Sequence, residues 1–304
     1  MNMLKEVLRL QVYPAMGCTE PASVALCAAH AAKALGEPAL EALFLLDPGT
    51  YKNGMGVSLP NAGGGKGNLL AGALGLLIAD PGGRMEVLKE ATPPLVRRAR
   101  ALLRSRAVRM VVAPDRRDSY VEAQVRGRRR RAVCVIAGSH SEVSRLERDG
   151  RVLLCAEGKA KPKGPRFKDL LRKASIRDLV RWAERMDDSD AAWLRKGVEM
   201  NLAAAASGMR LKKVGHYLQD LLRRGYLQND VFASTKLLTA SACDARMDGA
   251  AVPVMSSGES GKQGIVASLV PWQVGRSFGV PERTILRSIA LSHLLNAFVK
   301  CHTG

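Results

Sequence analysis

The sequence predicts an α+β protein that is mainly helical, with a small antiparallel β-sheet in the middle of the chain. Helix start and stop residues are frequent near both ends, whereas residues 108–155 hold short β-forming segments separated by turns. The 304 residues are 47% hydrophobic and 25% charged, which excludes a wholly disordered chain because there is enough apolar surface for a core.

Composition divides the chain into three sections. Residues 1–92 form an N-terminal α/β section, residues 93–165 a basic section with the small antiparallel sheet, and residues 166–304 a helical section with a Ser/Gly-rich loop. The segment 156–168 has the composition of a linker between the second and third sections.

The first section opens with an amphipathic helix, and a second helix is expected to follow Thr19, with Glu20 in its first turn and an apolar run over residues 22–35. Thr19 is expected to cap this helix, Pro21 sits where its missing N–H costs nothing, and Gly36 gives the stop signal. The helix is apolar nearly all round, so we expect it to be buried.

Residues 40–60 predict two strands joined by turn residues, and a glycine-rich stretch then leads into a helix of small residues. The second section begins with an arginine-rich helix, and its strands are expected at residues 108–114, 119–127 and 131–139. A hairpin should follow across Asp149 and Gly150, because Asp-Gly fits the primed turns that match strand twist.

The third section is expected to be mostly helical. Ser175 and Ser189 are candidate helix starts, Gly208 and Gly225 are candidate stops, and Pro281 marks the start of a last helix.

The charge is strongly positive, with 47 Lys and Arg against 28 Asp and Glu, a net charge of +19 and a pI near 10.1. The excess is densest at Arg126 and Arg128–Arg131. Such a balance suggests a polyanion partner, but no aromatic residue interrupts the arginine run, so a stacking platform for single strands is not visible. A solvated basic face is the simpler interpretation, and the polyanion partner stays as an alternative.

No membrane partner is expected. The longest apolar stretch, residues 69–79, is too short and too rich in glycine to span a bilayer. The N-terminus carries charges where a signal peptide needs an apolar core, which predicts a cytoplasmic protein.

Six scattered cysteines form no CxxC pair, which excludes zinc-ribbon and thioredoxin motifs. A functional cysteine should therefore act as a thiolate or as a metal ligand. A phosphate-binding P-loop is also excluded, because Gln263 and Gly67 stand where its Ser or Thr is needed.

Cys18 is the candidate for thiol chemistry. It directly precedes the expected start of a helix, where unpaired N–H groups and the helix dipole favour a thiolate. A base or nucleophile is one interpretation, and a small buried hydrophobic side chain is the other.

Three further features suggest a binding site. Lys52 and Asn53 are expected at a tight turn that either grips a carboxylate or is only a hairpin turn. Residues 241–265 gather hydroxyls and glycines, which let a backbone approach a ligand, although a plain loop is the competing account. His293 lies on an inward-facing stripe with Ile285 and Ile289, as either a core histidine or a catalytic one.

Four segments in this order resemble the L-cysteine desulfidase family, which is related to the alpha chain of iron–sulfur L-serine dehydratases. They are MGCTEPASVALCAAHAA at 16–32, YKNGMGVSLP at 51–60, ASACDARMDGAAVPVMSSGESGKQGI at 240–265 and LSHLLNAFVK at 291–300.

The resemblance implies a lyase that removes a β-substituent from a small L-amino acid without pyridoxal phosphate. L-Cysteine would give pyruvate, ammonia and sulfide, and L-serine would give pyruvate and ammonia. A [4Fe–4S] cluster would act as Lewis acid, and Cys18 would abstract the α-proton. The residues expected to bind the substrate are Glu20, Lys52, Asn53, Ser256, Ser257, Ser260, Gln263 and His293.

Two departures from the family pattern carry further expectations. Glu259 and Lys262 bring charges into a loop that is neutral in the family. Family members also continue beyond the last helix into a segment with the cysteines expected to ligate the cluster, whereas this chain ends at Gly304. We therefore expect most cluster ligands outside this chain, which would be a truncated product, a half with a separately encoded C-terminal partner, or a cluster-free paralogue.

The oligomeric state and the function each have an open alternative. A homo-oligomer is the alternative to a separately encoded C-terminal partner. The competing function is a non-catalytic basic paralogue that binds nucleic acid or another polyanion.

Overall fold

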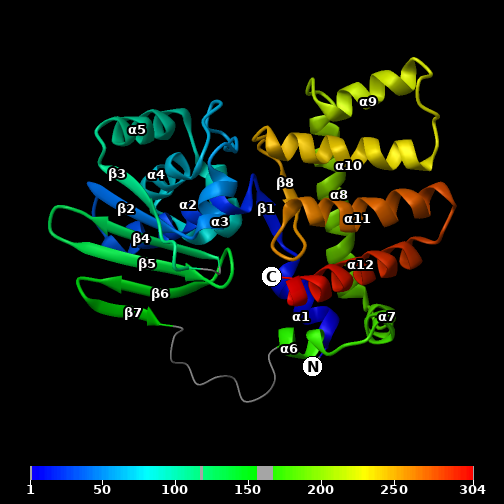
Figure 1. Ribbon diagram of the computed structural model, residues 1–304, viewed down its shortest axis with the longest axis horizontal. Coiled ribbons are helices and arrows are strands. Elements are labelled where there is room, and N and C mark those ends of the chain that lie inside the picture. The colour runs from blue at the N-terminus through cyan, green and yellow to red at the C-terminus, as the bar shows by residue number, and fades with distance from the viewer. Residues whose placement is uncertain (1, 117–118, 156–166, 304) are drawn as a thin grey trace. The chain divides into compact units, whose positions relative to one another are not determined.

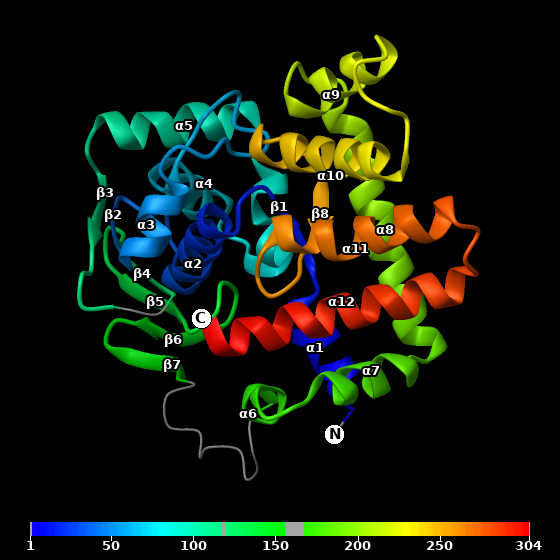
Figure 2. The same ribbon diagram turned by 45° about the vertical axis from the view of Figure 1, so that its right-hand side comes forward.

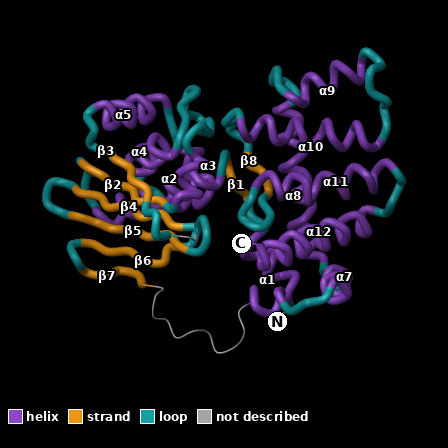
Figure 3. Tube along the Cα trace, viewed as in Figure 1, coloured by secondary structure: helices purple, strands orange, loops and turns teal. Residues whose placement is uncertain are grey.

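The computed structural model describes residues 2–116, 119–155 and 167–303 (Figure 1). The chain forms two compact units. The sheet unit comprises Met16–Lys161 and Met247–Ala251, and the helical unit comprises Met1–Ala15, Pro162–Arg246 and Val252–Gly304. The sheet unit combines its strands with helices, and the helical unit is almost entirely helical (Figure 3), which confirms the mainly helical α+β class. None of the described helices has the length and apolar character needed to cross a bilayer.

The sheet unit is built on a six-stranded sheet with the order β3-β2-β4-β5-β6-β7. Its strands are β2 (Glu41–Leu46), β3 (Val108–Val112), β4 (Tyr120–Arg126), β5 (Arg131–Ala137), β6 (Val143–Arg148) and β7 (Arg151–Cys155). All neighbours are antiparallel except β2 and β3, which are parallel. The predicted antiparallel sheet is confirmed with one correction, because β2 joins it from the first section and adds the parallel pair.

One face of this sheet is apolar and packs against α2 (Thr19–Leu35), and α4 (Asn68–Ile78) packs against α2 (Figure 2). Phe44 on β2 is fully buried there, and a Cβ atom at Gly72 of α4 would lie 2.5 Å from its ring. A Cβ at Gly75 would lie 2.1 Å from the carbonyl oxygen of Ala25, so glycine permits the two helices to approach at backbone distance. Helices η1 (Pro81–Glu90) and α5 (Pro93–Arg104) complete the unit.

The start of α2 differs by one residue from the prediction. Cys18, and not Thr19, is the N-cap residue, since Thr19 already has helical geometry. The predicted stop is confirmed, because Gly36 caps the helix in the left-handed region with φ of 70°.

The predicted second strand and tight turn near residue 53 are wrong. Residues Pro48–Gly54 form helix α3, with Lys52 and Asn53 in its last turn. Asp47 caps this helix by accepting a hydrogen bond from the backbone N–H of Thr50, at 2.9 Å, and Pro48 occupies the first helical position. A capping aspartate followed by proline is a helix start, and here it outweighs the hairpin preference of Asn-Gly.

The helical unit contains eight helices among the described residues and one short two-stranded sheet. They are α1 (Met3–Gln11), α6 (Phe167–Arg172), α7 (Ile176–Glu184), α8 (Asp188–Gly208), α9 (Val214–Arg223), α10 (Val231–Met247), α11 (Gly261–Ser277) and α12 (Glu282–Thr303), with β1 (Pro14–Met16) paired to β8 (Pro253–Met255). In both ribbon views α10, α11 and α12 lie one beside another and cross α8 (Figures 1 and 2).

Most predicted helix boundaries of this unit are confirmed. Ser175 caps α7 through a capping box, α8 ends at Gly208, and Gly225 follows α9 with a positive φ. The exception is Ser189, because Asp187 is the cap of α8. The predicted linker at 156–168 lies, up to residue 166, outside the described residues.

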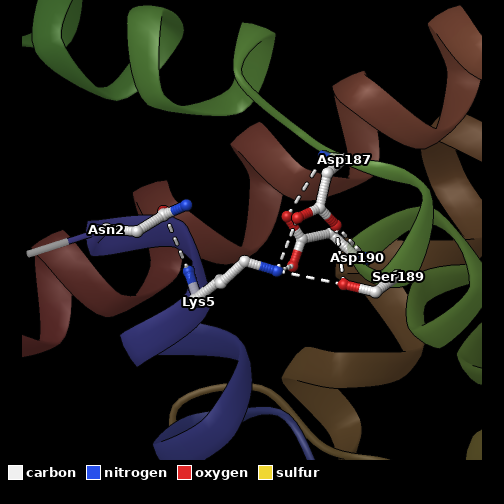
Figure 4. A network of polar contacts seen from close by, with 5 residues as sticks. All are labelled: Asn2, Lys5, Asp187, Ser189 and Asp190. Atoms are coloured by element: carbon white, nitrogen blue, oxygen red, sulfur yellow. Dashed lines mark hydrogen bonds and ion pairs between the residues drawn. The ribbon is translucent and has the colours of Figure 1, made fainter.

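The N-terminal helix is attached to the start of α8 by a charged network (Figure 4). Lys5 Nζ lies 2.7 Å from Asp187 Oδ2 and 3.1 Å from Asp190 Oδ1, and it donates to Ser189 Oγ at 3.0 Å. These contacts raise the pKa of Lys5 and hold that of Asp187 well below its ordinary value, mainly through the hydrogen bond between them. The network therefore fixes α1, from which the chain continues into β1.

Candidate functional site

The position of Cys18 is set by the residue before it. Gly17 has φ of 69°, and a Cβ atom there would lie 2.9 Å from Cδ of Pro60. Only glycine combines that backbone conformation with so close a neighbour at little cost. The turn at Gly17 directs the chain into α2, with Cys18 at the N-cap and its side chain making no capping hydrogen bond.

Cys18 contacts a carboxylate from the first turn of its own helix. Its Sγ donates a hydrogen bond to Glu20 Oε2 at 2.8 Å, and Thr19 Oγ1 donates to the same oxygen at 3.2 Å. Asn53 Nδ2 donates to the other oxygen, Oε1, at 3.3 Å. The structure thus brings together three of the predicted site residues, Cys18, Glu20 and Asn53, which we call the thiol cluster.

Glu20 is ionised at neutral pH. Burial is the largest influence and raises its pKa, but the hydrogen bonds from Cys18, its own backbone N–H and Thr19 act in the other direction. The charge of His140 adds to them, so the pKa of Glu20 lies below its ordinary value. Glu20 is therefore an acceptor for the thiol proton.

Two buried polar side chains place Asn53. Asp47 caps α3 and also accepts a hydrogen bond from the backbone N–H of Tyr120 on β4, at 2.9 Å. Within α3, Asn68 Nδ2 donates to the carbonyl oxygens of Thr50 at 2.8 Å and Tyr51 at 3.3 Å. Lys52 lies in the last turn of the same helix, but its side chain is exposed and hydrogen-bonds none of the described residues, so its predicted role stays a prediction.

The other predicted residues lie in the helical unit, on the loop between β8 and α11. Ser256 is fully buried, and its hydroxyl donates to the carbonyl oxygen of Tyr13 at 2.7 Å and accepts from the N–H of Tyr13 at 3.2 Å. The contacts of Ser256 thus fix the backbone of the loop. Substrate binding by Ser256 stays a prediction.

Ser257 lies at the centre of a second polar group. Its hydroxyl is 2.9 Å from Nδ1 of His293 and accepts a hydrogen bond from Nδ2 of Asn296 at 2.9 Å. The same amide nitrogen of Asn296 is 3.4 Å from Oε1 of Gln263. Ser257, Gln263, His293 and Asn296 form what we call the serine cluster.

His293 is neutral in the folded protein. Its side chain is buried, and burial lowers its pKa from 6.5 to about 4, because the interior disfavours the imidazolium. With Asn296 donating to Ser257, the serine hydroxyl can donate in turn to Nδ1 of the neutral ring. The predicted inward orientation of His293 is confirmed, and the ring orients Ser257.

The serine-rich loop is attached to α8 by Asn201, a fully buried residue. Its Oδ1 accepts from the N–H of Met255 at 2.9 Å, and its Nδ2 donates to Ser268 Oγ at 2.7 Å. A Cβ atom at Gly264 would lie 2.0 Å from the carbonyl oxygen of Met255, so the glycine lets α11 begin directly against the strand. Ser260 is the N-cap of α11 and accepts from the N–H of Gln263 at 3.5 Å.

Sequence reasoning missed Asn201, Asn296 and His140. Asn296 follows His293 by three residues, and this spacing places both on one face of a helix. The spacing could therefore have identified Asn296 as a neighbour of His293. Asn201 and His140 lie far along the chain from their partners, and nothing local marks them.

The described residues contain no group of three or more His, Cys, Asp or Glu side chains that could share a metal ion. They therefore supply no ligand set of their own for the [4Fe–4S] cluster that the resemblance implies, and the cluster stays a prediction. Cys27, for comparison, is buried on α2 and donates to the carbonyl oxygen of Cys134 at 3.2 Å. Burial raises the pKa of Cys27, which makes it a small core side chain.

Part of the basic run lines a hollow of about 1090 Å³ on the open face of the sheet. Four arginines contribute to the lining: Arg106, Arg109, Arg126 and Arg131. None of their side chains forms an ion pair within the described ranges. Acidic residues share the hollow, and one of them, Glu147, pairs with Arg145.

Comparison with known proteins identifies relatives over the whole chain. The family model described as "Serine dehydratase alpha chain" matches residues 84–304, which include the serine cluster but not Cys18. A UPF0597 protein of Elusimicrobium minutum is 52% identical over all of this chain and 72% of its own length. A UPF0597 protein of Geobacter sulfurreducens is 47% identical over all of this chain and 71% of its own. No solved structure matches the chain significantly.

We predict that His293→Gln removes part of the acid sensitivity of folding. The pKa of His293 is lower in the folded chain than the 6.5 of an exposed histidine, so protonation favours unfolding. Its contribution is complete above about pH 6.5 and is lost as the pH falls to about 4, a loss of about 3 kcal/mol.

The measurement is the free energy of unfolding in urea at pH 7 and pH 4. The wild type should lose about 3 kcal/mol more than His293→Gln between these two values. His302→Gln, exposed on the same helix, serves as the control and should follow the wild type. Equal losses in wild type and His293→Gln would contradict the prediction.

Proposed function

The chain belongs to the serine dehydratase alpha chain family, and from this we propose that it is a lyase that eliminates the β-substituent of a small L-amino acid. One observation supports the assignment of the base to Cys18. Its Sγ donates a 2.8 Å hydrogen bond to the carboxylate of Glu20 at the start of α2. A thiol whose proton is directed to an ionised acceptor is suited to act as a base.

In the proposed reaction the Cys18 thiol passes its proton to Glu20, and the resulting thiolate takes the proton from Cα of the substrate. The electron pair of the Cα–H bond forms the Cα–Cβ double bond, and the β-substituent leaves with the electrons of its bond to Cβ. The resulting aminoacrylate tautomerises to an imine, and water hydrolyses it to pyruvate and ammonia. Glu20 accepts the thiol proton and keeps Sγ in place, and Asn53 and Thr19 hold the Glu20 carboxylate by hydrogen bonds.

We propose L-cysteine and L-serine as substrates, with L-cysteine preferred because sulfide is a weaker base than hydroxide and leaves more readily. Recognition of the polar ends of the amino acid is assigned to Ser257, Ser260, Gln263 and Lys52. In this assignment His293 keeps the Ser257 hydroxyl in place.

A [4Fe–4S] cluster and a partner chain belong to the same proposal. Their support is membership of a dehydratase family in which the alpha chain implies a further chain or an oligomer. When bound, a cluster would supply a Lewis acid for the leaving group.

The test is pyruvate release from L-cysteine and from L-serine, under anaerobic conditions, with and without added iron and sulfide. Cys18→Ala should lower turnover by about 10²- to 10⁴-fold, the usual contribution of a general base. Glu20→Gln should lower it less, because the amide still accepts a hydrogen bond but carries no charge.

Cys155→Ala, on the exposed strand β7, is the matched control and should keep wild-type turnover. Turnover by Cys18→Ala at the wild-type rate would contradict the assignment of the base. Absence of pyruvate from both substrates in every condition would contradict the lyase itself.

A second candidate function rests on the hollow in the open face of the sheet. Four arginines without ion pairs in the described part of the chain line it, and we propose as the alternative that it binds nucleic acid or another polyanion. Four phosphate contacts would weaken binding to duplex DNA about 100-fold between about 50 and 200 mM salt.

A triple variant, Arg109→Gln with Arg126→Gln and Arg131→Gln, tests whether the hollow binds a polyanion. The triple variant should lose most of the affinity for a labelled DNA duplex and most of its salt dependence, measured by fluorescence anisotropy. DNA binding whose affinity does not depend on salt, or whose affinity is unchanged in the triple variant, would contradict the alternative.

A further inference from the structure

Arg246, near the end of α10, is a buried cation without a partner. Its relative exposure is 3%, and Nε is a buried donor that no acceptor satisfies. Across the described residues its guanidinium forms neither a hydrogen bond nor an ion pair. Arginine stays charged at every pH at which proteins fold, so this burial cannot be relieved by losing a proton.

Such an arrangement is costly for the folded chain alone. A buried charge that lacks a counter-ion destabilises the structure, and an aliphatic side chain of similar volume would pack there without that cost. An anionic ligand that reaches the guanidinium would remove the cost and be bound tightly by it.

The guanidinium lies against the N-terminus of α11, a helix of 17 residues. An ideal Cβ atom at Gly261, the first residue of α11, would be 2.4 Å from Nε and 2.6 Å from Cζ of Arg246. The absent side chain at Gly261 is therefore what allows the guanidinium to reach the helix end.

The helix end itself offers donors. The N–H groups of Gln263 and Gly264 are bonded to Ser260, at 3.5 and 3.0 Å. Those of Gly261 and Lys262 have no acceptor among the residues that the structure describes. Free N–H groups and the positive end of the helix dipole favour an anion at this position.

We propose that Arg246 and the N-terminus of α11 form a binding site for the carboxylate of the amino-acid substrate. The guanidinium fork matches a carboxylate, and the N–H groups of Gly261 and Lys262 would complete its hydrogen bonds. This site rests on the proposed function, because the substrate there is an amino acid. It also gives the charge of Lys262, unusual in this loop, a role in attracting the anion.

The experiment is calorimetric titration of the full chain with L-alanine, which has the ends of the substrate but no leaving group. L-Alaninamide, which lacks the carboxylate, is titrated in parallel. Arg246→Met should bind L-alanine about 10- to 100-fold more weakly than the wild type, the loss expected for one charge-assisted pair. L-Alaninamide should bind weakly to the wild type and to the variant alike.

Thermal unfolding without ligand separates binding from a structural role. Arg246→Met should unfold at the same temperature as the wild type or higher, since it removes an unpaired buried charge. Arg210→Met, at an exposed arginine of the same unit, is the matched control and should change neither binding nor stability.

Gly261→Ala is a second variant that keeps the arginine. The added Cβ must displace the guanidinium, so it should weaken L-alanine binding in the wild-type background and have little effect when combined with Arg246→Met. Additive effects of the two changes would overturn the inference.

The outcomes distinguish the site from the function. L-Alanine binding that is equal in wild type and Arg246→Met overturns the carboxylate site and leaves the lyase untouched. If L-alanine does not bind but acetate raises the unfolding temperature only when Arg246 is present, the anion site is supported and an amino-acid substrate is contradicted. If neither L-alanine nor acetate binds to the wild type, the inference is overturned.

Discussion

The buried amide of Asn201 fixes the backbone on which the serine cluster depends. It accepts from the N–H of Met255 and donates toward the carbonyl oxygen of Gly264 at 3.3 Å, so one side chain bonds both the end of β8 and the first turn of α11. Because the amide is fully buried, each bond that is lost would leave an unsatisfied polar group. The loop from Ser256 to Ser260 must therefore close in the few residues between these two fixed points.

The small number of residues in this loop explains its backbone conformation and the polar groups that it places. Two residues in it, Gly258 and Glu259, adopt positive φ, and Ser257 is turned inward to His293. At the start of α11, the N–H groups of Gly261 and Lys262 have no acceptor among the described residues, and the guanidinium of Arg246 lies against this helix end. In the sheet unit an equivalent constraint acts at Gly17, where a positive φ delivers Cys18 to the N-cap of α2. In each unit, glycine positions are what place the reactive or binding groups.

Local signals in the sequence were sufficient for most of the fold and for part of the site. Gly36 and the apolar run before it predicted α2, because capping and periodicity act over a few residues. The tight turn expected at Lys52 and Asn53 was wrong because Asp47 starts a helix there, and Asp47 is fixed in turn by its hydrogen bond to β4. Asn296 could have been predicted as a site residue, because it is a helical neighbour of His293. The role of Arg246 could not be predicted, because the burial of an arginine is decided by packing among distant segments.

The central claim is that Cys18 removes the Cα proton of a small L-amino acid. The most direct measurement is the loss of the Cα–H signal of L-cysteine, and of L-serine in parallel, followed by proton NMR in D₂O with wild type and Cys18→Ala. With Cys18 as the base, the signal should disappear with the wild-type protein, through exchange or elimination, and persist with Cys18→Ala. Loss of the signal at the same rate with both proteins would contradict it.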